Sequence, residues 1–139
     1  IKVIDSLKFT TPKGKVVYGG GGIIPDIFVA IDTTSYMSTF YFNTINDFAF
    51  NYVDNNRKPL EKWTISSFAA DFDNDQAVFN RYLSDIKDSA TPSFKTKQQL
   101  SKYLKASIAN TLFGNIGYYR IMHQDDKMLQ KVLELEVSN

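Results

Sequence analysis

The stretch Asp32–Val53, DTTSYMSTFYFNTINDFAFNYV, decides the fold, because it is the first long segment in which apolar residues follow a helical period. These residues recur every three or four positions and would share one helical face: Met37, Tyr41, Ile45, Phe48 and Tyr52. Capping residues precede the stretch at Asp32, Thr33 and Thr34, and Asp54-Asn55-Asn56 marks its end. Further aromatic residues widen the stripe, so we expect a helix buried over much of its girth: Phe40, Phe42 and Phe50.

The aromatic residues of this helix have two interpretations. An aromatic stripe at helical spacing is most often part of a hydrophobic core. The phenylalanines and tyrosines between residues 32 and 53 nevertheless exceed what one buried face needs, which favours a groove for a peptide or an apolar ligand. A second functional hypothesis follows, in which the chain is an independent binding or adaptor module that uses an aromatic helix face.

The next segment, Leu60–Asp73, is predicted to be an irregular or partly extended connection, anchored on the helices by Trp63, Ile65 and Phe68. A second helix is expected to start at Asp73, Asn74 or Asp75 and to end before Ala90-Thr91-Pro92, because proline disfavours helix in the residue before it. Its apolar residues again have helical spacing: Val78, Phe79, Tyr82, Leu83 and Ile86.

Two more helices are expected in the last third of the chain. Thr96 and Gln99 form a capping box for a helix that we expect to continue to about Met122, with a weak point at Gly114 to Gly117. The apolar face of this helix contains Leu100, Tyr103, Leu104, Ile108 and Leu112. Asp125 or Asp126 then caps a last helix with the apolar residues Met128, Leu129, Val132, Leu133 and Leu135.

Upstream of residue 32 the pattern is typical of β-structure. Residues 2–9 alternate as in a strand, Pro12 and Gly14 suit a tight turn, and Val16-Val17-Tyr18 is short and β-prone. Four glycines at residues 19–22 interrupt regular structure before a third apolar run of strand length, residues 27–31. We therefore predict an α+β, mainly α fold, with a β-hairpin or strand arm at residues 1–31 and a small bundle of about four helices at residues 32–139.

Composition excludes several classes of function. The 139 residues carry a net charge of +1, and the lysines are scattered among acids, which is not the pattern of a nucleic-acid-binding surface. No apolar stretch is long enough to span a membrane. The chain contains no cysteine, which rules out thiol catalysis, disulfides and cysteine metal sites.

Candidate catalytic residues give only weak motifs. Ser84 and Lys87 have the Ser-x-x-Lys spacing of penicillin-recognising enzymes, but the Ser-Asp-Asn and Lys-Thr-Gly companion motifs are absent. Ser101-Lys102 is a second serine–lysine pair. His123 is the only histidine, which leaves no two-histidine metal site, and we expect it at the surface near a helix end. The sequence therefore predicts no catalytic residues.

Ligand motifs are equally incomplete. Asp71, Asp73 and Asp75 alternate as at the start of an EF-hand loop, but Gln76 and Tyr82 occupy the positions that require glycine and glutamate. Helix capping explains these acids more simply. The glycines at residues 19–22 lack the lysine and the following helix of a phosphate-binding loop, so we interpret them as structural. We predict no metal and no cofactor.

One segment is specific enough to indicate a family. Thr10-Thr11-Pro12-Lys13-Gly14-Lys15-Val16-Val17-Tyr18 leads through Gly19–Gly22 to Ile23-Ile24-Pro25-Asp26-Ile27. This order resembles the end of the catalytic domain in the carboxyl-terminal processing (tail-specific) serine peptidases, in which Tyr-Thr-Pro-Ser-Gly-Arg precedes Gly-Ile-x-Pro-Asp-Ile/Val. Lys13 and Lys15 stand where that family usually has serine and arginine, and four glycines replace the usual one or two. Lys15 keeps the positive charge but lacks the guanidinium fork of arginine.

The resemblance implies that residues 1–31 are the C-terminal β arm of a peptidase domain and that residues 32–139 are its helical C-terminal domain. The family's nucleophilic serine and lysine base lie before this segment, so we expect this part of the enzyme to be inactive by itself. A weaker likeness to the tails of these peptidases covers Tyr118-Tyr119-Arg120, Asp125-Asp126 and Leu129–Leu135. The implied partners are the upstream protease domain, protein or peptide substrates and a second copy paired through the β arm, and the implied location is the cell envelope, in the periplasm.

Overall fold

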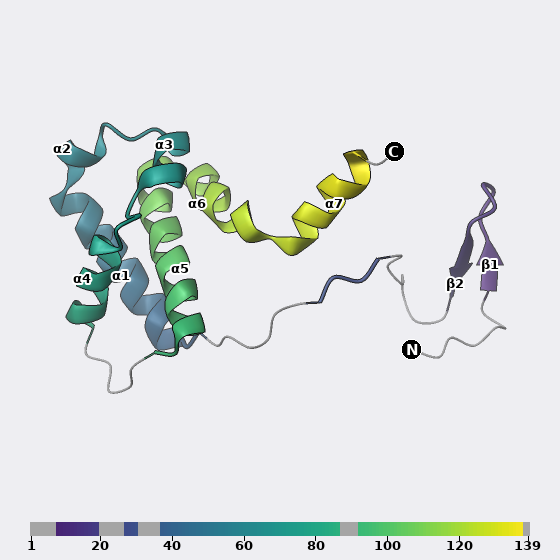
Figure 1. Ribbon diagram of the computed structural model, residues 1–139, viewed down its shortest axis with the longest axis horizontal. Helices are drawn as coiled ribbons and strands as arrows, with labels where there is room; N and C mark the ends of the chain where they lie inside the picture. The colour runs from purple at the N-terminus through teal and green to yellow at the C-terminus, as the bar shows by residue number, and fades with distance from the viewer. Residues whose placement is uncertain (1–7, 20–26, 31–36, 87–91, 138–139) are drawn as a thin grey trace. The chain divides into compact units, whose positions relative to one another are not determined.

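The computed structural model describes residues 8–19, 27–30, 37–86 and 92–137 (Figure 1). The chain divides into two compact units, Ile1–Ala30 and Ile31–Asn139. The first unit contains a short β-hairpin, and the helices belong to the second. The predicted α+β, mainly α fold with an N-terminal hairpin is confirmed.

The hairpin consists of β1, Lys8–Thr10, and β2, Val16–Tyr18, which pair antiparallel with Phe9 opposite Val17. In the turn, the amide of Gly14 donates to the carbonyl of Thr11 over 2.8 Å, and Gly14 has a φ of +80°. That angle belongs to the left-handed region, which glycine enters without the steric cost that a Cβ imposes. The hairpin turn predicted from Pro12 and Gly14 is therefore confirmed.

The other strands predicted in the β arm are not confirmed. Residues 2–7 of the expected first strand, and Gly20–Gly22, lie outside the described residues. Residues 27–30, which begin the third apolar run, form no strand. An apolar run becomes a strand only when a neighbour pairs with its backbone, and the described sheet contains β1 and β2 alone.

Seven α-helices are described in place of the predicted four. The first four are α1, Thr39–Asn55; α2, Arg57–Leu60; α3, Ile65–Asp71; and α4, Ala77–Asp85. The others are α5, Phe94–Phe113; α6, Asn115–Met122; and α7, Lys127–Val137, with a 3₁₀ turn at His123–Asp125 before α7. Helix α1 ends where the sequence indicates; the caps expected at residues 32–34 lie outside the described part, and Ser38 occupies the N-cap.

The prediction that residues 60–73 are irregular or partly extended is wrong, because α3 occupies half of this segment. A capping box starts the helix: the Thr64 hydroxyl accepts from the amide of Ser67 over 3.2 Å, and the Ser67 hydroxyl accepts from the amide of Thr64 over 3.1 Å. A helix of two turns is too short to show a clear apolar period. Of the three predicted anchors, Phe68 belongs to the buried core and Trp63 packs against it, whereas Ile65 is not among the residues of the core or those packed against it.

The start of α4 confirms the predicted capping by aspartates. Asp73 itself has a positive φ of 57°, and its carboxylate accepts from the amides of Val78 and Phe79 over 2.7 and 3.0 Å. Asp75 accepts from the amide of Ala77 over 3.2 Å. These carboxylates satisfy amides that have no partner within the first turn of the helix.

Two predictions about α5 need correction. Its cap is Ser93, whose hydroxyl accepts from the amide of Thr96 over 3.2 Å, so Thr96 lies inside the helix and not at its cap. The serine three residues earlier performs the role that we assigned to Thr96. The helix also does not continue to Met122: Gly114, with a φ of +70°, ends α5 and begins α6. The sequence predicted a weak point at Gly114 to Gly117, and the helix in fact ends there completely.

The core lies among the helices of the second unit and contains a single cluster of buried side chains. Helices α1 and α5 lie side by side (Figure 1), with the hydroxyl of Ser107 donating to the Asn46 side chain over 3.2 Å. The members of the core with less than a fiftieth of their surface exposed include Ile45, Ala49, Phe68, Tyr82, Leu100, Leu104, Ala106, Ile108 and Ala109. The predicted apolar face of α5 is confirmed.

The expectation that α1 is buried over much of its girth is wrong. Only one face is buried, through Ile45, Ala49 and Val53. Phe40, Phe42 and Phe50 are exposed, with 61% of Phe50 accessible. A widened stripe in the sequence becomes buried only if neighbouring helices cover it. Phe42 does meet Tyr103 of α5 edge to face at 5.5 Å, but this contact leaves 40% of Phe42 exposed.

Helix α7 is capped by Asp126, as predicted, through bonds from the amides of Met128 and Leu129 over 2.9 and 3.1 Å. None of its residues is buried, and its apolar side chains are exposed, among them Met128, Val132, Leu133 and Val137. Among the helices described, none has the length and apolar character needed to cross a membrane.

Candidate binding groove between α1 and α4

The serine–lysine pairs do not form a nucleophile and base in the structure. The Ser84 hydroxyl donates to the backbone carbonyl of Arg81 over 2.7 Å, and Lys87 lies outside the described residues. Ser101 donates to the side-chain oxygen of Gln76 over 3.0 Å, whereas the ammonium of Lys102 pairs with Asp125 at 3.2 Å. Each of these serines thus has a structural partner other than a lysine.

The other singled-out residues have structural roles. His123 is exposed at the end of α6, as predicted, and its ring stacks on Tyr119 with centroids 5.3 Å apart. Asp73 and Asp75 cap α4, and Asp71 is exposed at the end of α3. Within the part of the chain that the structure describes, no three acidic or histidine side chains gather in a way that could hold a metal ion.

A groove between α1 and the end of α4 is the best-formed candidate site. It encloses about 360 Å³, within the range of pockets that bind small ligands. One wall is a stripe along α1 with i, i+4, i+7 spacing, and the other is the last turn of α4. The lining residues are Phe40, Thr44, Asp47, Phe48, Asn51, Tyr52, Asn55, Asn56, Arg81, Asp85 and Ile86.

The floor of the groove is aromatic and well supported. The rings of Phe48 and Tyr52 lie nearly parallel, with an interplanar angle of 12° and centroids 6.0 Å apart. Beneath them the fully buried Tyr82 meets Phe48 edge to face at 5.5 Å, and its hydroxyl bonds Thr44 over 2.9 Å. Burial raises the pKa of Tyr52 above the ordinary 10.0, and the nearby Asp73 raises it further while Arg81 lowers it. At neutral pH the phenol is protonated at either value and can donate a hydrogen bond.

The rim of the groove is polar. The amide nitrogen of Asn55 donates to the backbone carbonyl of Asn51 over 2.8 Å, and that of Asn56 to the carbonyl of Tyr52 over 2.7 Å. Both carboxamides are therefore oriented by α1. The exposed side chain of Asn51 makes no hydrogen bond to any residue in the described ranges, so its donor and its acceptor are both available.

The rim carries few charged groups, and the negative ones outnumber the positive one. Arg81 and Asp85 approach to 3.9 Å on the α4 side, which is a long separation for an ion pair. Asp47, on the α1 side, forms no ion pair with another residue that the structure describes. The rim thus holds two carboxylates and one guanidinium, which favours a cationic ligand group near Asp47.

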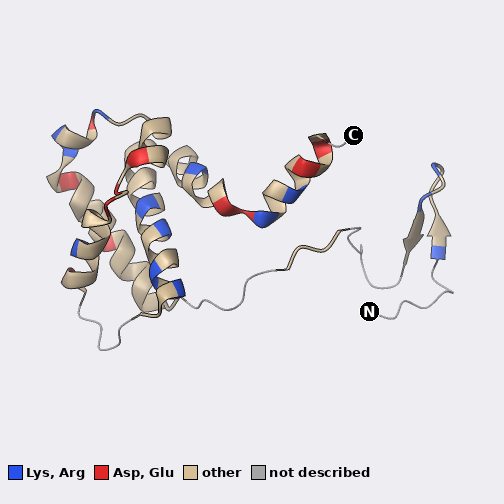
Figure 2. Cartoon of the chain, in the orientation of Figure 1, with Lys and Arg blue, Asp and Glu red and all other residues tan. Residues whose placement is uncertain are grey.

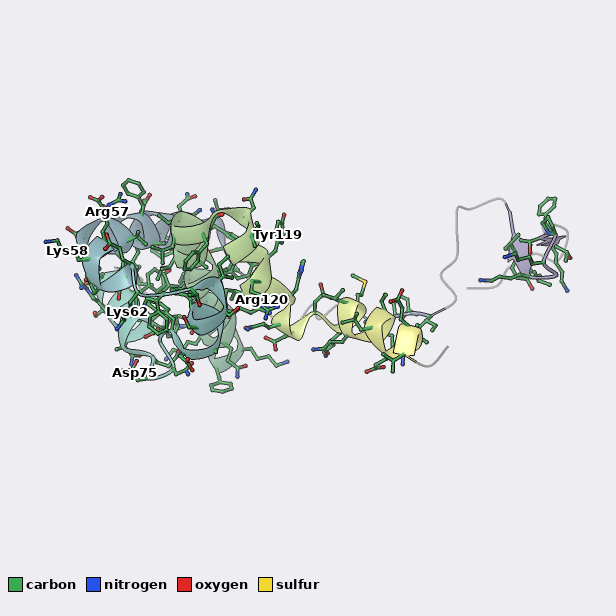
Figure 3. The ribbon with its side chains drawn as sticks, turned by 90° about the horizontal axis from the view of Figure 1, so that it is seen from above. Arg57, Lys58, Lys62, Asp75, Tyr119 and Arg120 are labelled. Atoms are coloured by element: carbon green, nitrogen blue, oxygen red, sulfur yellow. The ribbon has the colours of Figure 1, made fainter. Side chains whose placement is uncertain are left out.

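Elsewhere, some of the positive charges are paired with acids or lie against an aromatic ring. Figure 2 shows acidic and basic residues interspersed on most of the helices, whereas α5 carries lysines and no acidic residue. Arg57, Lys58 and Lys62 lie around α2 (Figure 3), but Arg57 pairs with Asp54 at 3.0 Å and the Lys62 ammonium lies 5.5 Å from the Trp63 ring centre.

A second cavity, of about 700 Å³, lies against α6 and the start of α7. Tyr119 and Arg120 of α6 line it (Figure 3), together with Ile65, Asn115, Ile116, His123, Gln124 and Leu129. Its apolar wall is weakly supported, since 72% of Ile116 and 53% of Tyr119 are exposed. The α1–α4 groove has the more rigid floor and is the stronger candidate.

The sequence indicated only part of this groove. An aromatic groove on α1 was one of the two interpretations, and Phe48 and Tyr52 do form its floor. Asn51, Asn55 and Arg81 were not singled out. Their signal was the spacing of Asp47, Asn51 and Asn55, which places three polar side chains on one edge of α1.

The fold and groove together define a small helical domain with an aromatic-floored cleft between two of its helices. The chain belongs to a protein family described as a family of unknown function (DUF8443), whose match covers residues 36–114. The matched region contains α1 to α5 and every residue of the α1–α4 groove. Comparisons with curated proteins and with solved structures gave no significant match.

Proposed function

We propose that this chain is the non-catalytic C-terminal portion of a carboxyl-terminal processing serine peptidase, an endopeptidase that acts on protein C-termini with a serine nucleophile and a lysine base. The segment that resembles this family, Thr10 to Ile27, contains the turn and the second strand of the hairpin, and the helical unit begins soon after it, at Ile31. The family match describes no activity, so it neither adds to this proposal nor opposes it.

One structural observation supports the proposal more than any other. The hairpin exposes apolar side chains on both of its faces, with 59% of Phe9 and 41% each of Val16 and Val17 accessible. Phe9 and Val17 are directly paired across the two strands. A two-stranded hairpin with uncovered apolar side chains is marginally stable in water, and it would be stabilised by joining a larger sheet. A peptidase domain upstream would supply that sheet.

The division of the chain near residue 30 agrees with the same proposal. A hairpin unit that completes a preceding domain and a helical unit with its own core would meet at this point. The helical unit would contribute stability, oligomer contacts or control of substrate access. The described residues supply no serine–lysine pair, and the proposal assigns that pair to the upstream domain.

The proposal also specifies partners and location. The hairpin would pair with the upstream protease domain, and in its absence with the hairpin of a second copy through the unpaired strand edges. The substrates of the whole enzyme would be proteins or peptides. Peptidases of this kind act in the cell envelope, so we propose a periplasmic location.

The decisive experiment uses the encoded protein that contains this chain. Its sequence before Ile1 should contain a serine and, some tens of residues later, a lysine. The intact protein should hydrolyse an unfolded protein substrate, and replacing that serine with alanine should abolish turnover. The 139-residue chain assayed alone should be inactive.

Two outcomes would overturn the proposal. One is the absence of a peptidase domain from the encoded protein upstream of Ile1. The other is hydrolysis by the intact protein that persists when every upstream serine is replaced. Adding Phe9→Ser to the intact protein tests the hairpin separately: it should lower the stability of the protease domain, whereas Lys13→Ser at the exposed turn should not.

A further inference from the structure

We propose that the α1–α4 groove binds an extended peptide segment that places an apolar side chain on the Phe48–Tyr52 floor and a basic side chain beside Asp47. This inference does not depend on the peptidase assignment, because the site lies wholly within the helical unit. If the peptidase assignment is also correct, the groove is a second attachment point for polypeptide, away from the catalytic residues.

The length of the groove matches an extended chain. Its α1 wall runs from Phe40 to Asn55, and fifteen residues of helix rise about 22 Å. An extended peptide of about seven residues has the same length. A compact small molecule would fill only part of this distance.

The side-chain amides of Asn51 and Asn55 on the rim can form hydrogen bonds with a peptide backbone. The unbonded carboxamide of Asn51 offers a donor group and an acceptor group, which match the C=O and N–H that one residue of an extended chain presents on the same edge. The side-chain oxygen of Asn55 lies one helical turn away, and its amide nitrogen is already used by α1. These two asparagines can therefore bond successive peptide groups without specifying side chains.

The floor and the charges supply selectivity. Phe48 packs edge to face on the buried Tyr82 and Tyr52 packs edge to face on the buried Phe72, so an apolar side chain would meet a preformed surface. Asp47 adds a carboxylate on the α1 side, which favours lysine or arginine over an acidic residue in the neighbouring position of the peptide. Arg81 and Asp85 close the opposite side.

The test measures binding of labelled, end-blocked heptapeptides to the 139-residue chain by fluorescence anisotropy. The probe has one phenylalanine and one lysine in a background of glycine and serine, and its counterpart has glutamate in place of lysine. We expect saturable binding of the lysine peptide with a Kd of about 1 mM or tighter. The glutamate peptide should bind several-fold more weakly.

Matched variants assign the binding to the groove. Asn51→Ala should weaken both peptides about fivefold, the effect of one hydrogen bond, whereas Asn110→Ala, at an exposed asparagine of α5, should leave both unchanged. Asp47→Lys should reverse the preference between the lysine and glutamate peptides. Glu61→Lys makes the same charge change at an exposed position outside the groove and should not reverse it.

Three results would overturn the inference. One is the absence of saturable peptide binding, and another is equal binding by Asn51→Ala, Asp47→Lys and their controls, which would place the peptide elsewhere, for example on the hairpin. The third is binding of N-acetyl-phenylalanine amide as tightly as the heptapeptide, which would indicate a small apolar ligand. None of these results bears on the presence of a serine–lysine pair upstream.

Discussion

Gly117 lies so close to Ala109 that a Cβ on the glycine would be 2.6 Å from the Ala109 carbonyl oxygen and 2.9 Å from the Phe113 Cβ. This contact is the reason that α6 can fold back against the end of α5. The Ala109 oxygen belongs to a helix backbone and cannot move aside as a flexible side chain can. The packing of the two helices therefore depends on the absence of a side chain at this position.

Replacing Gly117 with alanine should destabilise the helical unit by about 1–3 kcal/mol, because the overpacked contact outweighs the higher helix propensity of alanine. Denaturant unfolding measures this difference. Asn115→Ala, at an exposed position in the same turn of α6, is the control and should change stability by about 0.5 kcal/mol or less. An unchanged or more stable Gly117→Ala protein would refute the close packing.

Gly114→Ala should also destabilise the protein, but for a different reason. A Cβ at Gly114 would meet nothing within 4 Å, so packing is unaffected. The cost arises from the φ of +70°, and we expect about 1–2 kcal/mol. If α5 instead straightened into α6, helix content by circular dichroism would rise; unaltered helix content with lower stability is the expected result.

The carboxylate of Asp73 should stabilise the start of α4. Asp73→Gly keeps the positive φ accessible but removes both hydrogen bonds, and it should cost about 1–2 kcal/mol. Asp73→Asn retains one acceptor oxygen and should cost less. Thermal unfolding of the two variants gives the order, and an equal effect for both would show that the oxygen is not the stabilising group.

Lys105 should make stability depend on pH. Burial lowers the pKa of its ammonium from the ordinary 10.5, while the carboxylates of Asp73 and Asp71 partly oppose that shift. Between the lowered pKa and 10.5 the unfolded chain binds more protons than the folded chain, so this contribution to stability rises with pH. Lys105→Met should therefore stabilise the protein at pH 7, by at most about 1 kcal/mol because water screens a half-exposed charge.

The advantage of Lys105→Met should shrink as the pH approaches 10.5. Tyr52 and Tyr118 act in the opposite direction: burial raises the pKa of both phenols above 10.0, so their contribution is complete below pH 10 and is lost as the pH rises further. Both proteins contain these tyrosines, so the difference between their unfolding free energies isolates Lys105. A difference that stays constant between pH 7 and 10.5 would contradict a lowered pKa.

The sequence predicted turns, helix caps and helix faces correctly where one or two neighbouring residues decide the local structure. The positive φ of Gly14, the caps made by Asp73 and Asp126, and the apolar face of α5 all depend on side chains within a few residues. The short helix α3 was missed because its signal, the Thr64–Ser67 capping box, precedes only two turns of helix. The cap of α5 was misplaced by three residues because serine and threonine are both good caps.

The candidate groove was predictable only in part. Phe48 and Tyr52 lie on one face of α1 by helical spacing alone. Arg81 comes to the same cavity from thirty positions later in the chain, and no local pattern connects it with Asn51. Which aromatic residues of α1 are floor and which are exposed, as Phe50 is, depends on where α4 and α5 pack.

By itself, the sequence determined the class of the fold, the hairpin turn and the apolar faces of the main helices. Turn geometry and the hydrophobic period both depend on residues only a few positions apart. Only the tertiary structure decided the break at Gly114, the exposure of Phe40, Phe42 and Phe50, and the groove between α1 and α4. Those features depend on how closely distant helices approach, and Gly117 against Ala109 shows that a single absent Cβ can set that distance.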